Sequence, residues 1–288
     1  IPRQRRDHRG VPSGWVLGKE AVLLTSSCHP LCYSIPSDGA NNVCPIYTGI
    51  VTHSPPRIAI LGTGHMGGAI LGGLTHTAGA PGGIRVTTAS AASARALAGN
   101  GVEARSLEED STANQWAVEG ADIILLGVKP HYLLGLLEDV APHAPESAVM
   151  VSIAAGITVA QMESLWPGAL VRTMPNTPSQ VGKGVTGLSA GSRVSADQVR
   201  LVREVFETVG SVLEVEEDSL NALSTFSGSG PAFVYFFIER FMEVAREHGF
   251  TPEQATTMVQ GTFAGAMELL ESSGHTPEEL RDAVTSPG

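Results

Sequence analysis

Short apolar runs alternate with amphipathic stretches from about residue 57 to residue 220. The run at 121–128 is almost continuously apolar, which is typical of a strand buried on both faces of a parallel sheet. A helical pattern follows the first run, and a second helix is expected near 93–98. This alternation predicts a doubly wound α/β domain that binds its ligand at the carboxyl ends of the strands. Strands are expected at 57–61, 84–89, 121–128, 148–154 and 169–174.

The pattern changes after about residue 220, where the strand-like runs stop. The segment Ser227–Pro231 offers serines as helix N-caps and a proline for the first turn, so a long helix is expected to follow, reaching about residue 249. Two more helices are expected to begin at Thr251 and Thr276, the latter with a capping-box-like arrangement. The predicted domains are an α/β domain over 57–220 and an all-α domain over 221–288.

Residues 1–56 are rich in Pro, Ser, Gly and Arg and have little periodicity, so we interpret them as a low-order or spurious extension. The chain begins with Ile, which favours an incomplete or misassigned start. The arginine-rich opening suggests a transit peptide, but Asp7 and the prolines count against one. All three cysteines lie here, and their odd number predicts no disulfide framework and no zinc site. A reducing cytoplasm is therefore the expected compartment.

The formal net charge of this 288-residue chain is −11, which argues against a nucleic-acid partner because phosphate binding needs clustered Lys and Arg. No apolar run reaches the length of about 18–20 residues that a bilayer requires, so no membrane partner is expected. A hydrophobic content of 42% is ordinary for a globular protein.

The first predicted strand leads directly into Gly62-Thr63-Gly64-His65-Met66-Gly67. In a Gly-x-Gly-x-x-Gly pattern the first glycine permits a tight turn, the second lets the backbone approach a pyrophosphate, and the third lets the helix pack on the strand. The helix N-terminus then offers free N–H groups to the phosphates. Because a strand precedes and an amphipathic helix follows, the pattern favours a Rossmann-type dinucleotide site over a plain tight turn.

Folds of this type that prefer NAD usually carry Asp or Glu about 20 residues after the glycines, for the ribose hydroxyls. No carboxylate stands at 87–95. Ser90 and Ser93 could donate to a 2′-phosphate, and Arg95 could add positive charge. The sequence therefore favours NADP and leaves NAD possible, while Ser90 could equally be a helix N-cap.

Further short motifs follow in a fixed order along the chain: Val128–Pro130, Ser152–Gly156, Arg172–Pro178, Phe226–Ala232 and Val284–Gly288. Together with the glycine motif, they make residues 57–288 similar to the pyrroline-5-carboxylate reductase family. The resemblance implies hydride transfer from NADPH or NADH to the C=N carbon of 1-pyrroline-5-carboxylate, giving L-proline. An iminium already accepts hydride well, so the protein has mainly to align the nicotinamide and hold the substrate.

The resemblance also implies which residues contact the cofactor. Read without it, Asn114 could be an ordinary helix or turn residue, Lys129 a solvated lysine, and Asn176 a residue that only shapes a turn. The implied cofactor contacts are Leu61, Gly62, Thr63, Gly64, His65, Met66, Gly67, Ser90, Asn114, Val128, Lys129, Pro130, Ile153, Ala154, Ala155 and Asn176.

On the substrate side the resemblance implies Glu217 and Ser286, although the acidic run around Glu217 would otherwise be interpreted as a solvated loop. In the family the turn at Ser286 continues as Gly-x-Thr, whose N–H groups and hydroxyl hold a carboxylate. This chain stops first, so we expect it to be C-terminally truncated. The helical domain implies a homodimer or decamer. The apolar residues Phe233, Phe236, Phe237, Phe241 and Met242 fit that expectation, but would also fit a monomeric core.

Two alternatives remain open. The chain could be another NADP-dependent imine or hydroxyacid reductase of the same architecture, although such enzymes usually carry a lysine on the first long helix of the second domain. That helix, 231–248, contains no lysine. The chain could also be a fragment that binds the cofactor without catalysing the reaction.

Overall fold

The computed structural model describes residues 55–76 and 82–286. The chain divides into two units, Ile1–Ile50 and Val51–Gly288, and every described residue belongs to the second. The extension expected over 1–56 therefore lies outside the described residues, apart from its last two positions.

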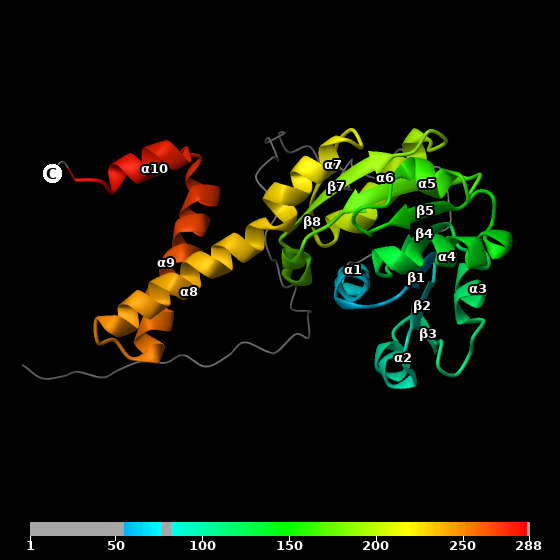
Figure 1. The fold of residues 1–288 in the computed structure, drawn as a ribbon, viewed down its shortest axis with the longest axis horizontal. Helices are drawn as coiled ribbons and strands as arrows, with labels where there is room; N and C mark the ends of the chain where they lie inside the picture. Colours follow the sequence, from blue (N-terminus) through cyan, green and yellow to red (C-terminus); the bar gives the residue numbers. More distant parts are fainter. Residues whose placement is uncertain (1–54, 77–81, 287–288) are drawn as a thin grey trace, which may run out of the picture. The chain divides into compact units, whose positions relative to one another are not determined.

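An eight-stranded sheet forms the first part of this unit, in the order β3-β2-β1-β4-β5-β6-β7-β8 (Figure 1). Neighbouring strands run parallel except at the β6–β7 pair, which is antiparallel. The strands are β1 Ile58–Leu61, β2 Ile84–Thr88, β3 Val102–Ser106, β4 Ile123–Leu126, β5 Val149–Ser152, β6 Ala169–Met174, β7 Gly184–Ala190 and β8 Gly210–Glu214.

Helices cover both faces of the sheet, which explains why the central strands are apolar at almost every position. Ile58 and Ile60 face a hydrophobic cluster that includes residues of α1 and α6, whereas Ala59 and Leu61 face one with residues of α3, α4 and α5. These elements are α1 His65–His76, α2 Ala91–Leu97, α3 Ala113–Val118, α4 Pro130–Val140, η2 Ala141–His143, α5 Val159–Glu163, η3 Thr177–Val181 and α6 Ala196–Glu207. The predicted doubly wound α/β domain is confirmed.

The second part is helical, as predicted, and contains α7 Ser219–Leu223, the π-helical turn η4 Ser224–Gly228, α8 Gly230–Glu247, α9 Pro252–Ser273 and α10 Pro277–Ala283. Capping boxes at Thr251 and Thr276 begin α9 and α10. The prediction that a serine side chain caps the start of α8 was wrong. Ser229 is the N-cap residue but makes no side-chain cap, and the Ser227 hydroxyl donates instead to the Leu223 carbonyl, because the chain enters α8 through η4.

The five strands expected from apolar runs are all present, with ends trimmed by one or two residues at four of them. The apolar pattern did not predict β3, β7 and β8. The edge strands β3 and β8 mix polar with apolar residues because they are partly exposed. In β7 a glycine interrupts the pattern, since a Cβ on Gly187 would lie 2.8 Å from the Leu220 side chain of α7.

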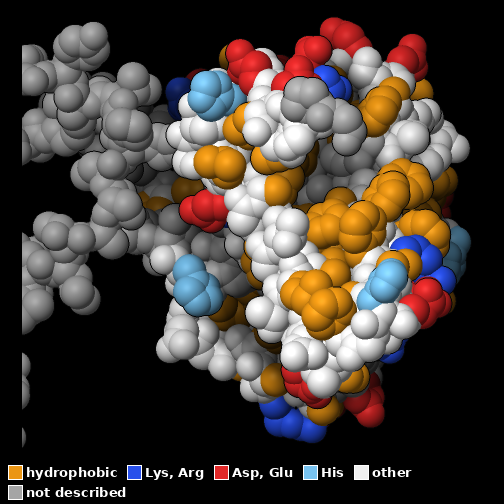
Figure 2. All heavy atoms as spheres, turned by 90° about the vertical axis from the view of Figure 1, so that its left-hand side faces the viewer, with side chains coloured by type: hydrophobic (Ala, Val, Ile, Leu, Met, Phe, Trp, Pro, Cys, Tyr) orange, Lys and Arg blue, Asp and Glu red, His pale blue; other side chains and the backbone are white. Residues whose placement is uncertain are grey.

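Hydrophobic side chains spread across the surface of the helical part (Figure 2). Four phenylalanines of α8 are each more than half exposed in the single chain, namely Phe233, Phe236, Phe237 and Phe241. Within the described residues, no helix combines the length and the apolar character needed to cross a membrane. The same residues contain no group of three or more His, Cys, Asp or Glu that could hold a metal ion.

Candidate functional site

The glycine motif forms the turn that joins β1 to α1. Gly62 has φ +89°, and a Cβ there would also lie 2.9 Å from the Gly127 carbonyl oxygen. A Cβ on Gly67 would lie 2.5 Å from the Gly62 carbonyl oxygen, whereas one on Gly64 would meet nothing within 4 Å. The first and third glycines are thus required by the turn and by helix packing, and the second leaves its backbone open to a ligand, as the motif predicts.

Residues that follow four neighbouring strands meet at the same edge of the sheet, since β2, β1, β4 and β5 are adjacent and parallel. The first turn of α1 follows β1, and Val128 and Lys129 follow β4, with Lys129 as the N-cap of α4 and Pro130 in its first turn. Ile153, Ala154 and Ala155 follow β5. We call this the cofactor edge. The structure brings most of the expected cofactor residues together here.

Asn114 lies on α3 at the cofactor edge, and its partner is a residue that the sequence analysis missed. The buried Thr87 hydroxyl donates to Asn114 Oδ1 at 2.7 Å and accepts from the Gly62 N–H at 3.3 Å. The Thr87 carbonyl accepts from the Thr63 N–H and hydroxyl, both at 3.1 Å. The end of β2 therefore links the glycine turn to α3. A strand threonine carries no sequence signal for such a role.

The segment that follows β2 holds the residues expected near a 2′-phosphate. Ser90 is the N-cap of α2, as the alternative interpretation had it, and its hydroxyl also donates to the Ser93 hydroxyl. Sequence analysis found no carboxylate within this segment, yet the Glu108 carboxylate, which follows β3, accepts from the Ala91 N–H at 2.8 Å. Glu109 pairs with Arg95 at 3.1 Å. Two carboxylates from a distant segment therefore lie against the expected 2′-phosphate residues.

Asp110 organises the loop that carries Glu108. Its carboxylate accepts from the Thr112 hydroxyl at 2.7 Å and N–H at 2.9 Å and pairs with Arg105. Hydrogen bonds from Thr112, followed by the one from Arg105, lower the pKa of Asp110 below its ordinary value. Hydrogen bonds and an ion pair of Asp110 thus connect the loop to both β3 and the start of α3.

Glu217, expected at the substrate, is bound to the sheet domain. Its Oε1 accepts from the Arg172 guanidinium at 2.9 Å and from the Val159 N–H at 2.7 Å. The Arg172 side chain is only 3% exposed, whereas that of Glu217 is 30% exposed. Glu217 is therefore not part of a solvated loop, and Arg172 is a second residue that the sequence analysis did not assign a role.

Asn176 and Ser286 differ from the other expected residues. The Asn176 side-chain amide donates to the Ser227 carbonyl and accepts from the Val185 N–H, so the turn-shaping alternative describes what it does here. Ser286 follows α10 and is exposed, and its side chain makes no hydrogen bond to any described residue. In the single chain, Ser286 has no contact that connects it to the cofactor edge.

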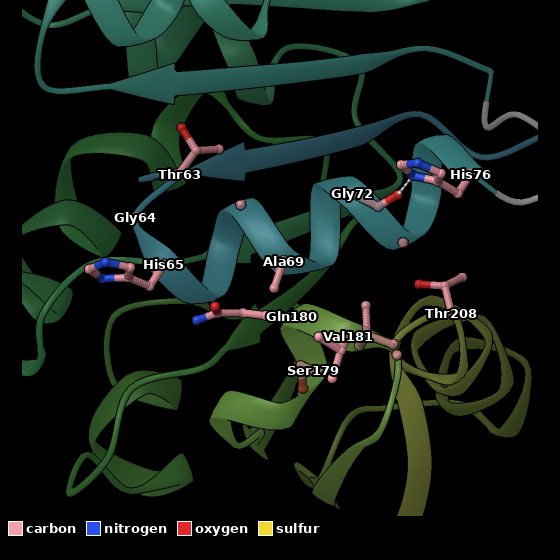
Figure 3. Close-up of a pocket in the computed structure, with 14 residues that line it drawn as sticks. Thr63, Gly64, His65, Ala69, Gly72, His76, Ser179, Gln180, Val181 and Thr208 are labelled. Carbon is pink, nitrogen blue, oxygen red and sulfur yellow. Dashed lines mark hydrogen bonds between the residues drawn. The ribbon is translucent and has the colours of Figure 1, made fainter. Parts of the chain in front are cut away.

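An open groove of about 910 Å³ runs between α1 and η3 (Figure 3). Thr63, Gly64 and His65 lie at one end of it and His76 at the other, where the His76 ring contacts the Gly72 carbonyl. Gln180 and Val181 form the opposite wall. The groove includes the first turn of α1 but not Ser90, Asn114 or Val128, so it adjoins the cofactor edge rather than coinciding with it.

Comparison with known proteins decides the family. A model described as pyrroline-5-carboxylate reductase dimerisation matches residues 217–288, and one described as NADP oxidoreductase, coenzyme F420-dependent, matches 57–156. A pyrroline-5-carboxylate reductase of Corynebacterium melassecola is 35% identical over 235 residues, which cover 80% of this chain and 85% of the relative. The chain belongs to the pyrroline-5-carboxylate reductase family. The expected family is thereby confirmed, and with it an NAD(P)H-dependent oxidoreductase fold in which a dimerisation domain follows a Rossmann-type domain.

Solved structures of pyrroline-5-carboxylate reductases agree with this placement. The protein from Coxiella burnetii superimposes with a TM-score of 0.73 at 31% identity, covering 82% of this chain and 87% of that one. The Plasmodium falciparum protein, whose structure has NADP bound, gives a TM-score of 0.70 at 25% identity and covers 82% and 86%.

Proposed function

We propose that this chain reduces 1-pyrroline-5-carboxylate to L-proline with hydride from NADPH. The observation that carries the proposal is the cofactor edge in a chain of this family, with the glycine turn, Asn114 and the residues after β4 and β5 gathered in one place. The cofactor contacts expected at Leu61–Gly67, Ser90, Asn114, Val128–Pro130, Ile153–Ala155 and Asn176 are part of this proposal.

The bound cofactor would supply the hydride, and the protein would orient the cofactor and the substrate and place charged groups beside them. The backbone around Gly64 is open to the pyrophosphate. Glu217 is a candidate to face the cationic imine, because Arg172 and Val159 engage its Oε1 and no described residue bonds its Oε2. Ser286 remains a proposed contact for the substrate carboxylate.

We also propose that the Rossmann-type domain spans 57–220, that the helical domain begins at 221, and that the protein is a homodimer or a decamer built from five dimers. The exposed phenylalanines of α8 support association, since so large an apolar surface is normally covered. A cytoplasmic location is proposed with it.

The test is oxidation of NADPH by the chain, followed as loss of the reduced-nicotinamide absorbance with 1-pyrroline-5-carboxylate. The six-membered cyclic imine and a 2-keto acid serve as comparison substrates. Turnover with 1-pyrroline-5-carboxylate supports the proposal. NADPH binding combined with turnover of only a comparison substrate would move the assignment to another imine or hydroxyacid reductase. Binding without any turnover, also in a copy extended along its reading frame, would refute the reductase.

Glu108 provides a prediction about cofactor preference. Replacing Glu108 by Gln keeps an oxygen that can accept from the Ala91 N–H but removes a negative charge near the expected 2′-phosphate. We expect NADPH to bind about fivefold more tightly relative to NADH, the equivalent of ~1 kcal/mol of repulsion at a solvated site. The ratio of the two dissociation constants measures this. Glu138→Gln on the exposed surface of α4 is the control, and an unchanged ratio in Glu108→Gln would contradict the prediction.

A further inference from the structure

Thr87 connects β2 to the glycine turn and to α3. Neither the glycine motif nor the family comparison assigns it a role. It is 1% exposed, at the carboxyl end of β2, on the sheet face that α3 covers. Its carbonyl and hydroxyl are both engaged, the first by the glycine turn and the second by the turn and Asn114. A substitution at Thr87 can remove the hydroxyl but leaves the carbonyl, because the carbonyl belongs to the backbone.

The hydrogen bond that the hydroxyl donates orients the Asn114 side chain. A threonine hydroxyl has one hydrogen and two lone pairs. The Gly62 N–H donates both to this hydroxyl at 3.3 Å and to the Thr87 carbonyl at 3.2 Å, and so faces one lone pair of the hydroxyl. The hydrogen of the hydroxyl donates to Asn114 Oδ1 at 2.7 Å. With Oδ1 bound to Thr87, the amide presents its Nδ2 hydrogens on the opposite side. No described residue accepts from Asn114 Nδ2.

Other contacts hold α3 itself, so the Thr87 hydroxyl acts on the Asn114 side chain rather than on the helix. The Arg85 and Arg105 guanidinium groups both lie over the Trp116 ring, 4.9 and 4.1 Å from its centroid. Arg85 also donates to the Trp116 carbonyl at 2.8 Å. The glycine turn likewise keeps its bonds to the Thr87 carbonyl if the hydroxyl is lost.

We propose that Thr87 is a positioning residue for the dinucleotide, whose hydroxyl holds Asn114 Oδ1 inward and so aims the Asn114 Nδ2 donor at the bound cofactor. The inference rests on the proposed function only in requiring that a dinucleotide binds at the cofactor edge. It adds a residue whose effect passes through Asn114. It treats NADPH and NADH alike because neither Thr87 nor Asn114 bonds to the described residues that are expected near the 2′-phosphate.

The test is a double-mutant cycle read as dissociation constants of NADPH and NADH for the full chain without substrate. Thr87→Val keeps the shape and removes the hydroxyl, and we expect it to weaken both cofactors about fivefold to tenfold, the usual effect of one lost hydrogen bond. Asn114→Ala should weaken them at least as much. If Thr87 acts through Asn114, the double variant binds no more weakly than Asn114→Ala alone.

Two controls separate positioning from folding. Thr87→Ser restores the hydroxyl and should bind within about twofold of the unchanged protein. Thr186→Val alters a buried strand threonine of β7 and should leave both dissociation constants unchanged. Additive effects of Thr87→Val and Asn114→Ala, or normal binding by folded Thr87→Val, would overturn the positioning role. If the unchanged protein binds neither dinucleotide, the proposed function itself is overturned, and this inference with it.

Discussion

Gly67→Ala is expected to weaken NADPH binding about 100-fold while the sheet remains folded. The added methyl carbon would lie 2.5 Å from the Gly62 carbonyl oxygen, so α1 must move away from the turn that it now touches. Overpacking of this kind costs about 1–3 kcal/mol of folding free energy. If most of this cost falls on the cofactor-binding turn, about 2.7 kcal/mol of binding free energy is lost, and we expect the NADPH dissociation constant to rise roughly 100-fold.

The neighbouring Gly68 is the matched control. A Cβ there meets nothing within 4 Å, so Gly68→Ala should stabilise α1 by about 0.5–1 kcal/mol. Titration of cofactor fluorescence and denaturant unfolding of both variants provide the comparison. Equal cofactor affinity in the two alanine variants would show that the close approach at Gly67 does not shape the binding site.

Glu217→Gln is expected to lower the free energy of unfolding by about 2–3 kcal/mol, because it leaves the Arg172 charge buried without its counter-ion. We place the loss below that of a fully buried pair since the Glu217 side chain is 30% exposed. Glu216→Gln is the control, because its side chain makes no hydrogen bond or ion pair to a described residue. Urea unfolding of the two variants measures the difference.

Pairing Glu217→Gln with Arg172→Met distinguishes the structural from the catalytic role of Glu217. Without the buried charge, most of the lost stability should return, since an apolar side chain can replace a buried ion pair at little cost. If Glu217 also faces the imine, kcat stays low in the double variant even though stability recovers. A double variant as unstable as the sum of the single ones would contradict the ion-pair explanation.

The turn at Gly62–Gly67 could be predicted because its requirements are local: a positive φ at the first glycine and close approach at the third. The apolar strands could be predicted for the same reason, since a strand that is buried on both faces has apolar residues at consecutive positions. The edge strands β3 and β8 could not, because half-exposed strands tolerate polar residues.

The missed site residues share a different reason. Thr87, Glu108 and Arg172 act through partners that are 17 to 45 residues distant in the chain. Glu108 supplies a carboxylate to α2 from beyond β3, so a search confined to the end of β2 could not find it. Such pairs depend on strand order, which the apolar pattern does not specify.

The uncovered phenylalanines of α8 have a consequence for every measurement above. In the proposed homodimer a second copy covers these rings, and folding and association then form a single equilibrium. The apparent melting temperature should then rise with protein concentration, as mass action requires. Unfolding midpoints of variants are therefore comparable only at equal molarity, and a substitution on α8 can lower the midpoint without weakening a contact within the chain.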